Sequence, residues 1–188
     1  EALESFKDIP EAVANTEKIA ERCHVELNLG KFIFPNFELE QGKTADQMLD
    51  ELTLKGVREH DLDGNSEIEE RRRHELNIIK NKNYAPYFLV VADLLRFAHE
   101  SKIYTTVRGS VAGSVVAYLS GITNVNPIEF QLPFERFLNL SRPSAPDIDM
   151  DFADNRRQEV IEYAKNKYGA DKVAQIGTFG TMLARGAV

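Results

Sequence analysis

The segment from Pro146 to Phe152 constrains the fold most, because aspartate alternates there with large apolar side chains. Such alternation is typical of a β-strand, in which successive side chains point to opposite faces. Asp147, Asp149 and Asp151 therefore share one predicted face, and the apolar residues between them share the other. The apolar face predicts packing against a core, and the acidic face is left for a polar function.

The acidic face has the chemistry of a divalent-metal site. Carboxylates at alternate strand positions start roughly 6–7 Å apart, so their tips can converge on metal ions about 3.5–4 Å apart. Like charges repel unless a cation lies among them, and Mg²⁺ prefers one or two carboxylates with water and phosphate. The alternative is an exposed edge strand whose acidic residues deter pairing with other chains. Alternating aspartates also occur in aspartate-nucleophile phosphatases and sugar-nucleotide transferases, so the motif does not indicate one reaction.

A second motif is the turn Arg108-Gly109-Ser110, between a β-prone run at 103–107 and a small-residue helix predicted over 111–119. At a helix start, backbone N–H groups attract anions, glycine lets phosphate approach, and a serine hydroxyl adds a donor. The turn lacks the lysine of a P-loop and the three glycines of a dinucleotide fingerprint. Alone, it fits equally well a tight turn for close helix packing. Together with the aspartate strand it indicates nucleotidyl transfer, with triphosphate at the turn and metal ions at the strand.

The remaining pattern predicts strands that alternate with helices, which implies a sheet covered by helices. Helices are predicted from apolar residues at helical spacing bounded by turn residues, and strands from short β-prone runs. The predicted helices span 10–20, 44–60, 66–79, 84–100, 111–119 and 155–168, and the extended or strand segments span 25–37, 103–107, 145–152 and 172–177.

Composition excludes several classes of protein. The length of 188 residues favours one main domain. The net charge of −7 argues against a self-sufficient nucleic-acid-binding module, which usually has a basic surface. Cys23 is the single cysteine, which excludes an internal disulfide, and the scattered histidines do not form a zinc site. The sequence shows neither a membrane-spanning run nor a signal-peptide pattern, so we expect a cytoplasmic protein.

Two further groups of side chains have competing interpretations. Opposite charges three and four residues apart in the segment 67–73 favour a solvated helix face over a DNA contact by its arginines. Tyr87 and Phe88 belong to the apolar face of the helix predicted over 84–100, which favours a place in the core over base stacking. The favoured interpretation is structural in both cases.

Five blocks of sequence occur in one order along the chain: Tyr87–Val91, Arg108–Ser110, Phe134–Asn139, Pro146–Phe152 and Gln175–Met182. Together they resemble the alpha subunits of bacterial DNA polymerase III. The resemblance runs from about Pro10 to the C-terminus, and the last four blocks are its most specific part.

The resemblance implies an α+β fold, namely a palm of the DNA polymerase beta-like nucleotidyltransferase type. Such a palm has a mixed sheet covered by helices, here with an N-terminal helical region. Residues 1–9 are then a connector from a preceding phosphoesterase-like domain, 10–178 the first part of the palm domain, and 179–188 the start of a thumb. A glycine-proline-glycine stretch usually precedes the arginine of the turn in the family. Residues 105–107 are Thr-Thr-Val here, which leaves the shape of the loop open.

The resemblance also implies site residues. Asp147 and Asp149 match the catalytic metal ligands of the family, which hold two Mg²⁺ ions that Mn²⁺ can replace. Arg108, Gly109 and Ser110 match the turn at the incoming triphosphate.

Arg136 is a further nucleotide-binding candidate, because Phe134, Phe137 and Leu138 flank it with apolar groups shortly before the aspartate strand. An arginine there can offset repulsion among the carboxylates or bind phosphate through two hydrogen bonds. A structural ion pair with Glu135 or another acid is the alternative.

The implied function is DNA-directed DNA polymerase activity in bacterial chromosomal replication, with primer-template DNA and dNTPs as partners. Other subunits of a replicative holoenzyme, including a sliding clamp, are expected to bind through regions outside this chain, and no membrane is expected to take part. Asp151 matches no catalytic position, and the third catalytic aspartate of the family comes later, after an inserted thumb. The isolated chain is therefore expected to be inactive. A noncatalytic nucleotide- or DNA-binding module on the same scaffold is the alternative.

Overall fold

The computed structural model describes residues 2–24, 37–141, 145–178 and 180, and the chain divides into two compact units, Glu1–Ile33 and Phe34–Val188. The extended pieces predicted over 25–37 and the thumb start predicted over 179–188 lie outside the described residues, apart from Phe37 and Gly180.

The first unit contains two helices, α1 (Ala2–Ser5) and α2 (Pro10–Ala20). Pro10 opens α2 as predicted, because proline has no N–H to lose in the first turn and its fixed φ suits a helix. The short helix α1 lies inside the predicted connector, for which the sequence predicts no helix. Neither helix has a buried residue.

Three long helices begin the second unit: α3 (Ala45–Glu59), α4 (Ser66–Asn81) and α5 (Ala85–Glu100). Their bounds lie within about two residues of the predicted spans. Thr44 and Gln47 form a capping box at the start of α3, in which Thr44 Oγ1 accepts from the Gln47 N–H at 3.2 Å and Gln47 Oε1 accepts from the Thr44 N–H at 2.8 Å. The Asn65 side chain caps α4. These polar caps fix where both helices start.

Helix α5 is the central helix of the second unit. One apolar face is predicted for it, but the helix is buried on nearly all sides, so that prediction is too narrow. The buried residues are Ala85, Phe88, Leu89, Val90, Val91, Ala92, Asp93, Leu95 and Ala98. Although α5 is so apolar, neither it nor any other helix of the described residues is long and apolar enough to cross a membrane.

The glycine-serine segment folds differently from the prediction. Strand β1 (Thr105–Arg108) ends at Gly109, the short 3₁₀ helix η1 (Ser110–Gly113) follows, and α6 (Val115–Leu119) begins only after Ser114. The single helix predicted over 111–119 is therefore wrong. Ser114 is extended, with φ −103° and ψ 120°, and its Oγ accepts a hydrogen bond from the Ala117 N–H at 3.0 Å. It thus acts as an N-cap that restarts the helix.

Further along, the 3₁₀ helix η2 (Phe134–Arg136) precedes strand β2 (Asp149–Phe152), which pairs antiparallel with β1. The register aligns Thr105 with Phe152 and Arg108 with Asp149. The strand predicted over 145–152 is thus shorter at its start, and the sheet of the described residues has two strands. Helices with a small sheet are compatible with the predicted α+β class.

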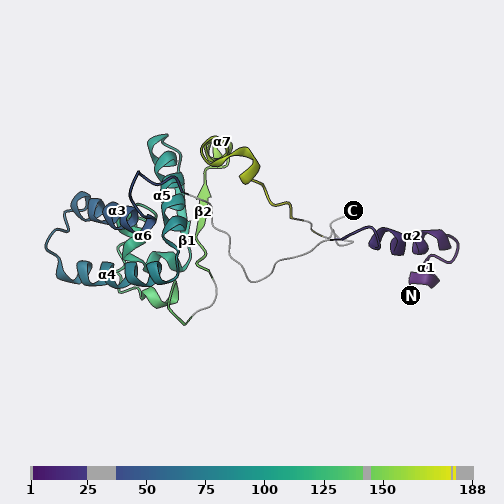
Figure 1. The fold of residues 1–188 in the computed structure, drawn as a ribbon, viewed down its shortest axis with the longest axis horizontal. Helices are drawn as coiled ribbons and strands as arrows, with labels where there is room; N and C mark the ends of the chain where they lie inside the picture. The colour runs from purple at the N-terminus through teal and green to yellow at the C-terminus, as the bar shows by residue number, and fades with distance from the viewer. Residues whose placement is uncertain (1, 25–36, 142–144, 179, 181–188) are drawn as a thin grey trace. The chain divides into compact units, whose positions relative to one another are not determined.

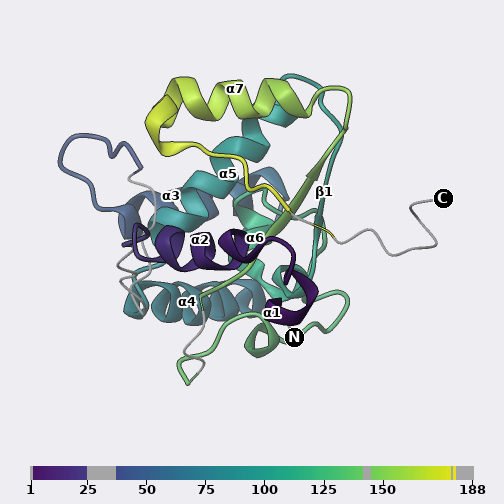
Figure 2. The same ribbon diagram turned by 90° about the vertical axis from the view of Figure 1, so that its right-hand side faces the viewer.

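Helix α7 (Arg157–Tyr168) and the 3₁₀ helix η3 (Ala170–Lys172) follow β2. Residues 173–178 have no regular structure, so the strand predicted over 172–177 is wrong. A β-prone run needs a neighbouring strand, and within the described residues β1 and β2 pair only with each other. Figure 1 shows α3 and α4 on one side of α5 and the β1–β2 ribbon with α7 on the other, and Figure 2 shows α4 and α7 at opposite ends of the unit.

The main core joins α5 to η2. Phe88, Phe134 and Phe137 are fully buried, with ring centroids 6.0 Å apart for Phe88 and Phe137 and 6.1 Å apart for Phe134 and Phe137. These edge-to-face contacts are a favoured aromatic geometry. Phe88 is therefore a core residue, as predicted, and the apolar neighbours of Arg136 anchor η2 to the core.

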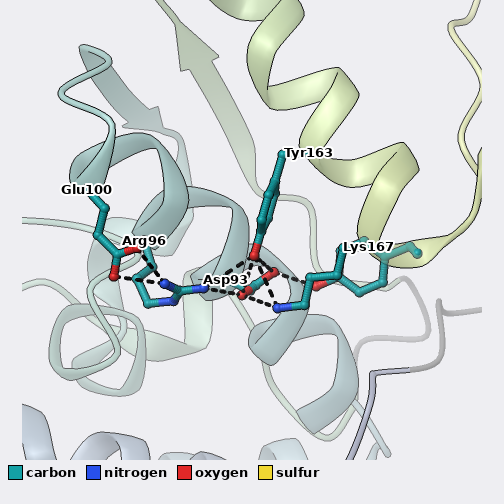
Figure 3. Close-up of polar contacts among 6 residues, drawn as sticks. Asp93, Arg96, Glu100, Tyr163 and Lys167 are labelled. Carbon is teal, nitrogen blue, oxygen red and sulfur yellow. Dashed lines mark hydrogen bonds and ion pairs between the residues drawn. The ribbon is translucent and has the colours of Figure 1, made fainter.

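A polar cluster around the buried Asp93 joins α5 to α7 (Figure 3). The Asp93 carboxylate accepts hydrogen bonds from Lys167 Nζ at 2.6 Å, Tyr168 Oη at 2.8 Å, Arg96 Nη2 at 2.9 Å and Tyr163 Oη at 3.0 Å. Burial alone raises the pKa of Asp93, but the hydrogen bonds from these donors outweigh burial and lower the pKa below its ordinary value. Because α7 directly follows β2, this cluster also anchors the far end of the aspartate strand.

Candidate active site

The β1–β2 ribbon brings Arg108 beside two aspartates. Arg108 lies opposite Asp149 in the ladder, and its guanidinium forms a two-point ion pair with Asp151, in which Nη2 and Oδ1 are 3.1 Å apart. The hydrogen bond to Asp151 and the charges of Asp151 and Asp149 raise the pKa of Arg108. The guanidinium is therefore held at the acidic strand, although the side chains of Arg108 and Asp151 remain 63% and 44% exposed.

Asp147 lies beyond the start of β2, yet the predicted alternation continues there. Pro146 and Ile148 are buried, whereas Asp147 and Asp149 are exposed. Within the described parts of the chain, no residue donates a hydrogen bond to either exposed carboxylate. Both side chains are thus available to an external cation.

Tyr87, in the first turn of α5, connects these two aspartates. Its hydroxyl oxygen accepts a hydrogen bond from the backbone N–H of Ile148, the residue between them, at 3.2 Å. Burial raises the pKa of Tyr87, the Ile148 hydrogen bond lowers it, and the negative charges of Asp147 and Asp149 raise it further. The Tyr87 hydroxyl therefore binds the backbone between the two aspartates. Sequence reasoning assigned Tyr87 to the core, and only its polar tip within an apolar run indicates a further role.

Gly109 separates β1 from η1 in a conformation that needs glycine. Its φ of +94° and ψ of −161° lie in a region that is essentially closed to other residues. A Cβ built there meets no atom within 4 Å, so the backbone angle rather than crowding requires glycine. Ser110 is exposed at the start of η1. The turn therefore presents an open backbone beside Arg108, and the Thr-Thr-Val sequence ahead of it is accommodated as strand β1.

The α-helix after the glycine-serine turn starts later than predicted, at α6, and Glu75 of α4 occupies this start. Glu75 Oε2 accepts from Ser114 Oγ at 2.7 Å and from the Val116 N–H at 3.0 Å, and Oε1 accepts from the Val115 N–H at 3.0 Å. Burial raises the pKa of Glu75, and these hydrogen bonds act in the opposite direction. The start of α6 is thus filled by an internal carboxylate. Any phosphate at Ser110 must rely on the turn itself.

Arg71 of α4 extends this buried network to two loops. Its Nε donates to Glu75 at 2.9 Å, and its Nη2 donates to the carbonyl oxygens of Gly113 at 3.2 Å and Leu132 at 3.1 Å. The two loops approach closely, since a Cβ on Gly113 would lie 2.7 Å from the carbonyl oxygen of Pro133. The Arg71–Glu75 pair therefore links η1, α6 and the segment that leads into η2.

The other arginines of α4 differ in environment. Arg72 is 5% exposed, forms ion pairs with Asp50 and Glu69, and donates to Thr53 Oγ1 at 3.0 Å. The Arg73 side chain is 75% exposed. The predicted solvated face is thus wrong for Arg71 and Arg72 and correct for Arg73, because the first two are drawn inward by partners distant in sequence.

Arg136 is exposed on η2, which packs against η1. The loop that carries Arg136 is therefore a neighbour of the glycine-serine turn. Its predicted contact with phosphate or with the aspartates stays a prediction. The alternative partner, Glu135, lies 3.5 Å from His74 Nε2 through Oε1.

The donor set at the ribbon fits a hard divalent cation only in part. No group of three or more histidine, cysteine, aspartate or glutamate side chains in the described residues is arranged to hold a metal ion. Asp147 and Asp149 supply two exposed carboxylates, which suits Mg²⁺ when water and phosphate oxygens complete its shell. The ribbon thus offers part of a metal site.

Comparison with known families identifies the chain. The sequence profile described as "Bacterial DNA polymerase III alpha NTPase domain" matches residues 47–188. The chain belongs to the bacterial DNA polymerase III alpha family. The matched span includes the ribbon, the glycine-serine turn and the Glu75 network, and the predicted family is confirmed.

Individual relatives support the same family. The chain is 49% identical to the DNA polymerase III subunit alpha of Halalkalibacterium halodurans over 100% of its own length, and 45% identical to that of Bacillus subtilis over 97%. It is also 45% identical, over 99% of its length, to the error-prone DNA polymerase of Symbiobacterium thermophilum. The chain spans only 16–17% of the length of these relatives.

Proposed function

We propose that residues 10–178 are the first part of the palm domain of a DNA-directed DNA polymerase, with a polymerase beta-like nucleotidyltransferase architecture. Residues 1–9 are then a connector and residues 179–188 the start of a thumb. One observation carries the proposal: two exposed aspartates lie at the start of β2 and just before it, and the partner strand β1 runs directly into a turn that only glycine can form. Membership of the family supports it.

In this proposal, Asp147 and Asp149 hold two Mg²⁺ ions, which Mn²⁺ can replace. When bound, these ions activate the attacking and leaving oxygens of nucleotidyl transfer. Gly109 and Ser110 bind the incoming triphosphate through the open backbone of the turn and the serine hydroxyl.

Two arginines complete the proposed nucleotide site. Arg108 exchanges Asp151 for phosphate, which the exposure of this ion pair permits. Arg136 reaches the same phosphates from η2. The guanidinium group suits both because it binds phosphate oxygens through two parallel hydrogen bonds.

The proposed biological setting is chromosomal replication in the bacterial cytoplasm. Primer-template DNA and dNTPs are the proposed substrates, and other holoenzyme subunits, including a sliding clamp, bind through regions outside these residues. The net charge of −7 is consistent with a need for further contacts to hold DNA.

Mn²⁺ binding to the 188-residue chain, followed by electron paramagnetic resonance, tests the metal site. Asp147→Asn and Asp149→Asn are each expected to weaken binding at least about tenfold, since even groups that only support a metal ligand change affinity by 10–100-fold when removed. Thermal unfolding should change little, because both side chains are exposed. Asp63→Asn, an exposed aspartate outside the site, is the matched control. Wild-type affinity in both site variants would exclude the assignment.

Primer extension tests whether the isolated chain holds a complete active site, and the metal dependence of nucleotide binding separates a polymerase site from a noncatalytic module. The isolated chain is expected not to extend a primer, because the described residues supply two carboxylates rather than a complete metal site. A noncatalytic module would bind nucleotide equally well with and without metal ions. Template-dependent extension by the isolated chain would show that Asp151 or another resident carboxylate completes the site.

A further inference from the structure

The carboxylate segment before β2 lacks the support of the sheet. The β1–β2 ladder ends at the pair Arg108 and Asp149. Gly109, which follows Arg108, turns away from β2 with a φ of +94°. Ile148 and Asp147 therefore lie beyond the paired strands. The position of Asp147 must be set by something other than strand pairing.

The Tyr87 hydroxyl provides this missing partner. Ile148 is 7% exposed, and a buried backbone N–H without a hydrogen-bond acceptor is costly. The Ile148 N–H donates instead to Tyr87 Oη at 3.2 Å. A side chain thus takes the place of a neighbouring strand at this point.

Tyr87 is itself held by the core. It lies in the first turn of α5, and its ring packs edge to face against Phe88, with centroids 6.4 Å apart. Phe88 has no exposed surface. The hydroxyl therefore extends from a rigid helix, which makes it suitable for fixing a loop.

We propose that Tyr87 is a positioning residue for the metal-binding carboxylates, and that it acts on Asp147 more than on Asp149. The inference rests on the proposed function, because it concerns the same two ligands. Asp149 is held within the ladder, whereas Asp147 depends on the Ile148 hydrogen bond and on the buried Ile148 side chain. Loss of the hydroxyl should therefore leave the fold in place and release the Asp147 backbone.

Tyr87→Phe removes only the hydroxyl and keeps the ring in the core. The Mn²⁺ dissociation constant of the 188-residue chain is expected to rise about tenfold, the lower end of the range for removing a group that supports a metal ligand. Tyr168→Phe is the matched control, because it also deletes a bonded hydroxyl, 2.8 Å from Asp93, on the α5–α7 side of the unit. The control should bind Mn²⁺ like the wild type. Wild-type affinity in Tyr87→Phe would overturn the proposal.

A double-mutant cycle separates positioning from general loosening. If Tyr87 acts through Asp147, Tyr87→Phe should cost little further affinity in an Asp147→Asn background and keep its effect in an Asp149→Asn background. A merely structural residue would weaken binding equally in both backgrounds, and that result would also overturn the proposal. Paramagnetic relaxation of water protons follows the weak binding of these variants.

Hydrogen exchange at the Ile148 amide distinguishes failure of this inference from failure of the proposed function. Exchange is expected to be faster in Tyr87→Phe than in the wild type and unchanged in Tyr168→Phe. If the wild-type chain binds no Mn²⁺, the proposed metal site fails, and the exchange rate alone decides whether Tyr87 holds the segment. Unchanged exchange in Tyr87→Phe would refute the positioning role.

Discussion

Glu75 and Asp149 show two opposite uses of a carboxylate within one unit of the chain. Glu75 is fully buried, and its oxygens accept hydrogen bonds from a serine hydroxyl, two backbone N–H groups and Arg71. Asp149 is exposed, and no described residue donates a hydrogen bond to its carboxylate. The first acid has its complete set of partners inside the protein, whereas the second faces solvent, with other acids and Arg108 beside it.

This difference separates structural from functional acids on physical grounds. A buried charge is tolerated only when other groups satisfy it, so its neighbours identify it as part of the scaffold. An exposed acid on a strand that packs its other face into the core is positioned without being satisfied. The Glu75 network and the ribbon should therefore respond oppositely to substitution, with large losses of stability in the first and large losses of ligand binding in the second.

Glu75→Ala should produce the largest loss of stability. It leaves Arg71 and the start of α6 without their shared partner, and breaking a buried ion pair typically costs about 3–5 kcal/mol. Urea denaturation of the 188-residue chain measures the free energy of unfolding. Because the substitution also opens an anion-sized space lined by hydrogen-bond donors, added formate should restore part of the lost stability.

Glu70→Gln is the matched control for Glu75. It removes a negative charge from the same helix at an exposed position, so its free energy of unfolding should stay close to that of the wild type. A similar loss of stability in both variants would show that charge on α4, rather than the buried network, matters. If formate stabilised the wild type as much as it stabilises Glu75→Ala, that result would contradict the internal anion site.

Asp93→Asn should produce an intermediate loss of stability that depends on pH. Hydrogen bonds to charged groups contribute about 1.5–3 kcal/mol each, and the amide can replace only part of those that Asp93 accepts from α7. The pKa of Asp93 is lowered in the folded chain, so its stabilisation is present above the unfolded pKa near 4 and is lost as pH falls through the lower folded value.

The pH series isolates the Asp93 cluster from other acids. Between about pH 5 and pH 2, the free energy of unfolding should fall less steeply for Asp93→Asn than for the wild type. Asp63→Asn, at an exposed position, should keep the wild-type slope. Parallel slopes for Asp93→Asn and the wild type would mean that Asp93 is not bound as a carboxylate in solution.

Local signals in the sequence account for most of the helical scaffold. Pro10 and Thr44 mark helix starts through properties of their own residue type, and the alternation around Asp149 survives in the pattern of exposure. The break at Ser114 escaped prediction because a run of small residues reads as one helix, although serine is a typical N-cap. Resemblance to a family supplied the candidate site residues more specifically than any local pattern.

Long-range contacts explain what the sequence could not reveal. Arg71 pairs with Glu75 one helical turn away, but both also reach residues about 40 positions away, which spacing along a helix cannot indicate. The hydrogen bond from Ile148 to Tyr87 spans 61 positions. The run at 172–177 has strand-like composition but no strand beside it among the described residues. In each case a partner distant in the sequence, or the lack of one among the described residues, decides the local structure.

Asp151→Asn should have the smallest effect on stability. It decides whether Asp151, the third acid of the ribbon, is a structural acid like Glu75 or a metal ligand like Asp149. In the Arg108–Asp151 pair, Arg108 is exposed and Asp151 is half-buried, and ion pairs in contact with solvent contribute little to stability, so unfolding should be nearly unchanged. Mn²⁺ affinity should also stay near the wild-type value, because the Asp151 carboxylate binds Arg108 rather than a metal ion. Nucleotide binding should become tighter, since Arg108 no longer has to exchange Asp151 for phosphate. A loss of Mn²⁺ affinity as large as that of Asp149→Asn would instead make Asp151 a metal ligand.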